Sequence, residues 1–278
     1  MASDERKGVK MAPEPVKPAS PRSSVLLNQD PENLRAMAAD ASLTPDLALG
    51  LLKHPDLSAE MLEQLGRNGA ALKHRNVKLA LVEHPKTPRH VSLPLLRQLY
   101  TFELMQVALT PVAPAHIKLA ADQALLKRLE TISWGEKLTL AHRASGRVAG
   151  ELLRDGEARL VRAALENSRL TEGLIVRVLM RPDAPAALVE AVCHHPQWSL
   201  RREVRVALLR NEKTPFARAV EFARTMPVAE VREILQNSRL PGNAKSYLVK
   251  DLENRVSKTG SRKQGVENRD RASNPVSR

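Results

Sequence analysis

Residues 81–88 read Leu-Val-Glu-His-Pro-Lys-Thr-Pro, and this stretch predicts a tight connection between two helices. Proline disfavours helical geometry in the residue before it, so the first helix is expected to end at His84. Thr87 is expected to accept a hydrogen bond from a free N–H of the next helix. Pro88 is expected to occupy the first position of that helix, where no donor is needed. The short spacing between these signals leaves room only for a tight turn.

The same signals return along most of the chain. Residues 208–215 read Leu-Leu-Arg-Asn-Glu-Lys-Thr-Pro, which keeps the spacing and replaces His-Pro by Asn-Glu. Further helix starts and helix ends are marked by Asp30-Pro31, Thr44-Pro45, His54-Pro55, Arg181-Pro182 and His195-Pro196. No sustained alternation of apolar and polar residues interrupts them. The chain is therefore predicted to be all-α and built from many short helices.

An internal repeat supports this architecture. Residues 77–128 align with residues 204–255 without a gap, and about 12 of the 52 aligned pairs are identical. A second echo joins residues 165–170, which read Leu-Glu-Asn-Ser-Arg-Leu, to residues 235–240, which read Leu-Gln-Asn-Ser-Arg-Leu. Repeats of this kind are typical of chains in which each helix pair packs against the next.

These units, each an apolar helix, a His-Pro or Asn-Glu turn and a second apolar helix, resemble the leucine-rich repeat variant units of bacterial proteins. They are also similar to the broader class of HEAT-like α-solenoids. The resemblance covers roughly residues 30–255 and lies in spacing and punctuation. It implies a right-handed α-solenoid of stacked short helix pairs with a concave binding surface. The variant-repeat family is associated with an N-terminal iron–sulfur cluster bound by cysteines, which this chain lacks.

The composition agrees with stacked helices. Apolar residues make up 42% of the 278 residues, but aromatic residues only 3%, so the core must be built from Leu, Val and Ala. Such a core suits closely packed helices better than a β-sandwich. The net charge of +13 bears on partners and not on the fold. It is compatible with an acidic protein or peptide, a nucleic acid or an anionic membrane surface as partner, and also with a basic surface that is only well solvated.

Three segments are expected from the distribution of apolar residues. Residues 1–24 are polar and proline-rich and predict a disordered leader. Residues 25–256 are expected to form the helical repeat domain. Residues 257–278 nearly lack apolar side chains and predict a disordered basic tail. No apolar run is long enough to span a membrane and no signal sequence is recognised, so we expect a cytoplasmic protein without membrane insertion.

Arginine residues at helical spacing are the candidate binding residues. If the helices stack in register, arginines three or four positions apart would form a row along one face, suited to carboxylates or phosphates. Glutamates between them argue instead for a mixed surface. The row consists of Arg159, Arg162, Arg177, Arg181, Arg201, Arg202 and Arg205, and the tail adds Lys258, Arg262, Lys263, Arg269 and Arg271.

No cofactor or metal is expected. A single cysteine, Cys193, excludes a disulfide within the chain and a cysteine-ligated cluster, and its apolar neighbours suggest a core position. His194 and His195 are adjacent on a helix and point about 100° apart, so they chelate one ion poorly. Gly146 and Gly150 lie four residues apart, which favours close helix contact over phosphate binding.

Three functions remain in view, in order of preference. The first is a non-catalytic scaffold that binds an acidic protein or peptide, with the basic tail adding avidity. The second is a sequence-independent nucleic-acid binder that uses the arginine row and the tail. The third is an enzyme similar to the HEAT-like DNA glycosylases, for which the chain offers Trp134, Trp198, Asp155 and Asp183. No local motif of that family matches these four positions, so no catalytic residue is assigned.

Overall fold

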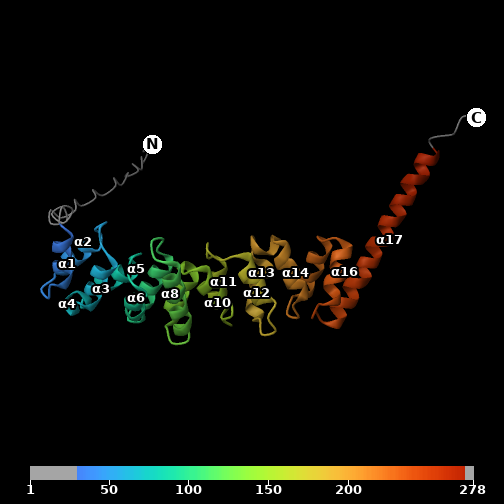
Figure 1. The fold of residues 1–278 in the computed structure, drawn as a ribbon. Helices are drawn as coiled ribbons and strands as arrows, with labels where there is room; N and C mark the ends of the chain where they lie inside the picture. Colours follow the sequence, from blue (N-terminus) through green and yellow to red (C-terminus); the bar gives the residue numbers. More distant parts are fainter. Residues whose placement is uncertain (1–29, 273–278) are drawn as a thin grey trace, which may run out of the picture. The chain divides into compact units, whose positions relative to one another are not determined.

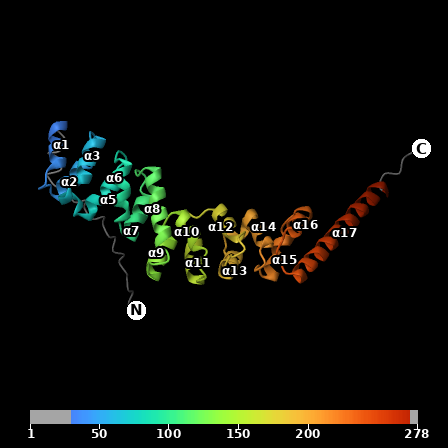
Figure 2. The same cartoon turned by 60° about the horizontal axis from the view of Figure 1, so that its bottom comes forward.

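The structure, a computed structural model, describes residues 30–272, and all regular elements within that range are helical, as predicted. The predicted leader lies outside the described residues. The helices (Figures 1 and 2) are α1 (Pro31–Ala39), α2 (Pro45–Leu51), α3 (Ala59–Arg67), α4 (Gly69–Leu72), α5 (Arg75–Glu83), α6 (Arg89–Arg97), α7 (Thr101–Leu109), α8 (Ala115–Arg128), α9 (Trp134–Arg143), α10 (Gly146–Leu152), α11 (Ala158–Leu165), α12 (Glu172–Leu179), α13 (Ala186–His194), the 3-10 helix η2 (Trp198–Leu200), α14 (Arg202–Arg210), α15 (Phe216–Arg224), α16 (Val228–Gln236) and α17 (Gly242–Ala272).

The chain divides into two compact units, Met1–Leu99 and Tyr100–Arg278. In the first unit, α1 packs against α3, and α5 packs against α2, α4 and α6. Its core is built from leucine, valine and alanine side chains such as Leu51, Leu62 and Leu81, which are fully buried. The interior therefore has the small aliphatic side chains expected from the composition.

The second unit has two layers of helices. In one layer α8, α10, α12, α14 and α16 contact each other in that order, and in the other α9, α11 and α13 do so. Figure 2 shows these helices following one another along the unit in chain order. The apolar residues at positions 160, 161, 164 and 165 of α11 are all buried, as their spacing predicts.

The repeated Lys-Thr-Pro sequence has one structural role in both units, and it differs from the expected one. The hydroxyl of Thr87 donates to the carbonyl oxygen of Leu81 at 2.7 Å, and Thr214 donates to Leu208 at 2.6 Å. The threonine therefore closes the end of the preceding helix instead of capping the next one. Pro88 correspondingly lies just before α6 as its N-cap and not at its first position.

Histidine and asparagine are interchangeable at these joints because both accept the same backbone hydrogen. His84 Nδ1 accepts from the N–H of Lys86 at 3.2 Å, and Asn211 Oδ1 accepts from the N–H of Lys213 at 2.9 Å. The two lysines also correspond. Lys86 Nζ donates to the carbonyl of Pro55 at 3.0 Å and Lys213 Nζ donates to that of Ala184 at 2.7 Å. Each joint is thereby tied to an earlier one about 30 residues back in the chain.

Glycines allow two helices of the second unit to meet closely, as the sequence predicts. A Cβ atom on Gly146 would lie 2.1 Å from the carbonyl oxygen of Arg169, and one on Gly150 would touch Leu174 at 3.4 Å. Gly146 begins α10, and Leu174 lies in α12. The predicted capping box at the start of α9 is also present, since Ser133 and Glu136 exchange hydrogen bonds.

The expected segment boundaries at residues 24 and 256 stay predictions. The first lies outside the described residues, and α17 continues across the second as unbroken helix to Ala272. The first part of α17 packs against α15 and α16. None of the helices in residues 30–272 is both long enough and apolar enough to cross a membrane.

Candidate functional site

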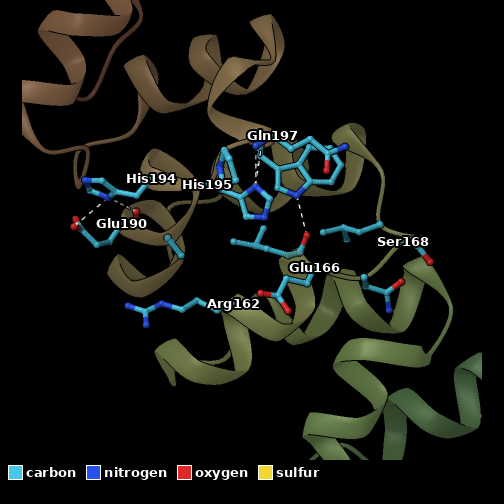
Figure 3. A pocket seen from close by; sticks show the side chains of 13 residues that line it. Arg162, Glu166, Ser168, Glu190, His194, His195 and Gln197 are labelled. Carbon is cyan, nitrogen blue, oxygen red and sulfur yellow. Dashed lines mark hydrogen bonds and ion pairs between the residues drawn. The ribbon is translucent and has the colours of Figure 1, made fainter. Parts of the chain in front are cut away.

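A cleft lies in the second unit, between the end of α11 and the turn that follows α13 (Figure 3). Its volume is about 790 Å³, within the range usual for ligand pockets. Leu165, Leu170, Pro196 and Trp198 contribute apolar surface, and charged or polar side chains surround it. These are Arg162, Glu166, Asn167, Ser168, Glu190, His194, His195 and Gln197.

The buried Trp198 forms part of the cleft and joins two turns. Its indole Nε1 donates to the carbonyl oxygen of Leu165 at 2.9 Å, and the side chain is only 6% exposed. The carbonyl at the end of α11 would otherwise lack a helical partner. Trp198 therefore has the structural role of packing against a neighbouring joint.

His195 presents a hydrogen-bond donor to the cleft. Its Nδ1 accepts from the N–H groups of Gln197 at 3.2 Å and Trp198 at 3.3 Å. Burial lowers the pKa of this imidazole, and the nearby Glu166 opposes that shift. The neutral ring therefore carries its hydrogen on Nε2. The ring points into the cleft (Figure 3), so this N–H is available to a ligand.

The two carboxylates of the cleft lie near histidines. Glu190 Oε1 is 3.4 Å from His194 Nδ1 within α13, and Glu166 Oε2 is 3.9 Å from His142 Nδ1. Both glutamates are largely exposed. Arg162, one turn before Glu166, makes no ion pair or side-chain hydrogen bond with any residue from 30 to 272. Because arginine keeps its charge at all ordinary pH values, Arg162 is also the only permanently charged cation among the cleft residues.

Most of the predicted arginine row is already engaged by other side chains. Arg181 pairs with Asp183 at 2.9 Å, Arg202 with Glu203 and Glu230 at 2.6 Å each. Arg205 donates to the carbonyl of Ser199 at 2.7 Å and to Thr225 at 3.0 Å, and Arg159 lies over the Trp134 ring at 5.1 Å.

The remaining members of the row are Arg162, Arg177 and Arg201, which are exposed and have no such partner among the described residues. Arg162 belongs to α11, and Arg177 belongs to α12 in the other helix layer. The seven arginines therefore come from helices of both layers, and the row that the spacing suggested stays a prediction. The tail positions from Lys258 to Arg271 belong to the backbone of α17, and their side chains lie outside the described residues.

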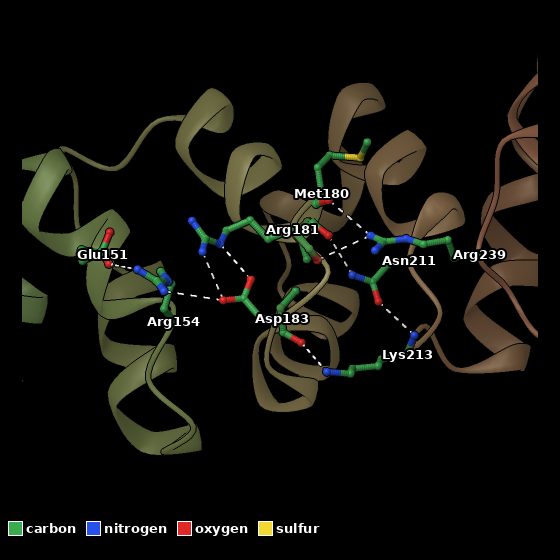
Figure 4. A network of polar contacts seen from close by, with 10 residues as sticks. Glu151, Arg154, Met180, Arg181, Asp183, Asn211, Lys213 and Arg239 are labelled. Carbon is green, nitrogen blue, oxygen red and sulfur yellow. Dashed lines mark hydrogen bonds and ion pairs between the residues drawn. The ribbon is translucent and has the colours of Figure 1, made fainter.

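Arg181 is held in a polar network around the joint between α12 and α13 (Figure 4). Asp183 accepts two hydrogen bonds from Arg181, at 2.9 and 3.2 Å, and lies 3.6 Å from Arg154, which also pairs with Glu151. The hydrogen bonds from Arg181 lower the pKa of Asp183 to about 2. Arg239 reaches the same joint and donates to the carbonyl of Met180 at 3.2 Å. This network stabilises a joint and leaves Arg181 little capacity for a ligand.

Two arginines that the sequence analysis overlooked lie at joints near the cleft. Arg143 ends α9, and Arg169 lies between α11 and α12. Both are exposed, and neither has an ion pair with residues 30–272. The repeated Asn-Ser-Arg-Leu sequence was the signal for Arg169, but it was used only as a mark of internal repetition.

The described residues contain no group of three or more His, Cys, Asp or Glu side chains placed to hold a metal ion. Cys193 is buried, and burial raises the pKa of its thiol to about 12. Asp155 lies 3.5 Å from Lys137, and Asp183 belongs to the arginine network. Neither aspartate lines the cleft that contains Trp198.

Comparison of the chain with known protein families, with curated proteins and with solved structures gives no match in any of the three.

Proposed function

We propose that this chain is a non-catalytic interaction scaffold whose second unit binds an acidic protein or peptide. The distribution of aromatic side chains carries the proposal. All seven aromatic residues lie in the second unit, although they are only 3% of the chain. Five of them are between 44% and 65% exposed, namely Tyr100, Phe102, Trp134, Phe216 and Tyr247. Exposed Trp and Tyr side chains together with Arg are enriched at binding hot spots.

The charge of the second unit supports an acidic partner. This unit carries 30 Lys and Arg residues against 20 Asp and Glu, whereas the first carries 14 against 11. The basic positions of α17 from Lys258 onward would add avidity to contacts made elsewhere on the unit. Opposite charge on the partner would steer association and select against basic proteins.

The proposal includes the finer architecture of a right-handed α-solenoid of HEAT-like helix pairs. Its support is the order of contacts, in which each helix of a layer packs against the helix two positions later. The hydrogen bonds between joints support the same stacking, because each of them links a joint to an earlier one in the chain. A crystal structure of the whole chain would test the handedness of the solenoid directly.

The binding proposal can be tested with purified full-length protein and three fluorescent probes of equal length. These are a glutamate-rich peptide, a lysine-rich peptide and a single-stranded DNA, each titrated at low and at physiological ionic strength. We expect the acidic peptide to bind most tightly at physiological ionic strength. Phosphate contacts weaken steeply with salt because counterions are released. Tighter binding of DNA under those conditions would replace the scaffold by a nucleic-acid binder, and absence of acidic-peptide binding would overturn the proposal.

A further inference from the structure

Three consecutive joints of the second unit are hydrogen-bonded to one another. Asn167 Nδ2 donates to the carbonyls of Ala141 at 2.8 Å and Ala144 at 3.1 Å, which ties the α11–α12 joint to the α9–α10 joint. Trp198 Nε1 ties the turn after α13 to Leu165 at the end of α11. We call the three joints, residues 143–147, 166–171 and 195–201, the joint edge. Their relative positions are held by buried donors and not by flexible surface contacts.

Each joint of this edge carries at least one exposed arginine without an ion pair to any described residue. These are Arg143 and Arg147 in the first joint, Arg169 in the second and Arg201 in the third. Acidic groups also lie nearby, and Glu190 borders the cleft. Glu166 lies near His142, and Asp122 is buried beneath Ser145, whose hydroxyl donates to it at 2.7 Å, with Arg147 close by. The edge therefore presents a net positive charge that the chain itself leaves unbalanced.

The cleft opens between the second and third joints of the edge. Along this cleft the side chains of Ser168 and Gln197 and the Nε2–H of His195 offer hydrogen bonds, and Leu170, Pro196 and Trp198 offer apolar surface. Figure 3 shows Ser168 and Gln197 on the two joints that border it. Backbone groups of an extended peptide could be bound there between two of the arginines.

The distance between successive joints indicates which peptide conformation fits them. Helices in one layer stack about 8–10 Å apart, so successive joints and their arginines recur at about that interval. A polyproline II segment rises about 3.1 Å per residue with three residues per turn, and so displays every third side chain on one face at intervals of about 9 Å. The two intervals agree, whereas an α-helix would place equivalent side chains closer together.

We propose that the joint edge binds an extended peptide segment with acidic side chains at every third position, one for each of Arg143, Arg169 and Arg201. This inference rests on the proposed function and names its site and ligand. A nucleic acid fits the edge less well. It carries a phosphate about every 3.4 Å of helix axis on each strand, nearly three per arginine, which does not match the interval between joints.

Two peptides of identical composition test the spacing. Four repeats of Pro-Pro-Glu place the carboxylates at every third position, and the comparison peptide has its four glutamates in a row among the same eight prolines. We expect the full-length protein to bind the spaced peptide about tenfold more tightly, as measured by fluorescence anisotropy. Equal affinities, or tighter binding of the clustered peptide, would overturn the spacing argument.

Two double variants with the same change of charge test the site. Arg169→Glu with Arg201→Glu should weaken binding of the spaced peptide about tenfold or more, because two attractions become repulsions. Arg89→Glu with Arg232→Glu alters exposed, unpaired positions within α6 and α16 and should change the affinity less than about twofold. Far-UV circular dichroism should be unchanged in both variants, since neither site uses the arginine side chain for packing.

The outcomes separate this inference from the function on which it rests. Equal losses of affinity in the two double variants would show that the joint edge is not the binding site. The proposal that the chain binds acidic peptides would still stand. Failure of the unmodified protein to bind either peptide would remove both. Displacement of the spaced peptide by a single-stranded oligonucleotide at a lower concentration than by the clustered peptide would assign the edge to nucleic acid instead.

Discussion

The two units use the same joint chemistry but present different surfaces. In the first unit Thr87 and Lys86 close a joint, and in the second Thr214 and Lys213 make the corresponding hydrogen bonds. Residues 1–99 contain no aromatic residue, whereas the second unit carries all seven and most of the excess positive charge. Internal repetition here preserves the hydrogen bonds between joints and leaves the exposed positions free to differ. We therefore expect the second unit, and not the first, to bind the acidic partner.

The largest expected effect concerns the glycine contacts, which differ between the units. In Gly146→Ala the new Cβ would meet backbone, the carbonyl of Arg169 at 2.1 Å, and a destabilisation of about 3 kcal/mol is expected. In Gly66→Ala it would meet the side chain of Val91 at 2.4 Å, which can turn aside, so the loss should be smaller. Urea unfolding would measure both.

Gly135→Ala is the matched control, because no atom lies within 4 Å of its added Cβ at the start of α9. This variant should be neutral or slightly more stable, since alanine favours helix over glycine. If Gly146→Ala were tolerated as well as Gly135→Ala, the close contact between α10 and the α11–α12 joint would be wrong.

The second prediction tests whether the repeated threonine has equal value in the two units. Thr87→Val and Thr214→Val each remove the hydroxyl that donates to a helix-end carbonyl oxygen, although the carbonyl of Leu208 still accepts from the N–H of Asn211, and each should cost about 1 kcal/mol. Trp134 and Trp198 both lie in the second unit, so tryptophan fluorescence reports on that unit, and far-UV circular dichroism reports on both.

We expect Thr214→Val to shift the fluorescence transition and Thr87→Val to shift mainly the dichroism. Thr→Ser at either position retains the hydroxyl and serves as the control. A large loss in one unit and none in the other would show that the aligned threonines are not equivalent.

The third prediction concerns how stability depends on pH through His84 and His195, which lie at two of the joints. Burial lowers the pKa of His84, with a contribution from Lys86, and burial likewise lowers the pKa of His195. The folded state therefore prefers the neutral rings, whose Nδ1 atoms accept backbone hydrogens. This stabilisation is complete above the unfolded pKa of about 6.5 and is lost as the pH falls through the lower folded value.

Thermal stability should accordingly fall between about pH 7.5 and pH 5.5. Replacing both histidines by asparagine, the residue found at the equivalent position 211, should reduce that dependence while keeping the acceptor. A wild-type protein that becomes more stable over the same interval would contradict the assignment of neutral imidazoles at these joints.

The smallest effect is expected at the exposed Arg181–Asp183 pair. Arg181→Ala should return the Asp183 pKa from about 2 toward its ordinary value of 3.8, because the hydrogen bonds from Arg181 are its largest cause. Stability at neutral pH should hardly change, since exposed ion pairs contribute little. Carboxylate resonances followed by NMR would measure the shift, and an unchanged Asp183 pKa would place the main influence on Arg154.

Sequence patterns predicted the helices well, because proline, the capping serine and the apolar spacing act within a few residues. The all-α class, the buried face of α11, the capping box at Ser133 and the close approach at Gly146 are all confirmed. The arginine row stays a prediction. Spacing within one helix shows which side chains share a face, but whether an arginine meets a carboxylate depends on helices that pack later in the chain.

The two copies of Asn-Ser-Arg-Leu show where local information ends. In the first copy Asn167 is buried and donates to two carbonyls, and Ser168 is exposed at the cleft. In the second copy Asn237 is exposed, and the buried Ser238 donates to the carbonyl of Leu209 at 2.6 Å. The buried, donating position thus moves from the asparagine to the serine, one residue later in the motif. The reason is that α16 ends one residue closer to its copy of the motif than α11 does.

By itself, therefore, the sequence determined that this chain is helical, where most of its helices begin and end, and which residues recur at its joints. Those properties follow from backbone geometry and apolar periodicity over short distances. Only the tertiary structure decided which joint residues are buried, which arginines remain unpaired and where a cleft opens. These depend on carbonyls and side chains 26 to 33 residues away, which become neighbours only when the layers pack.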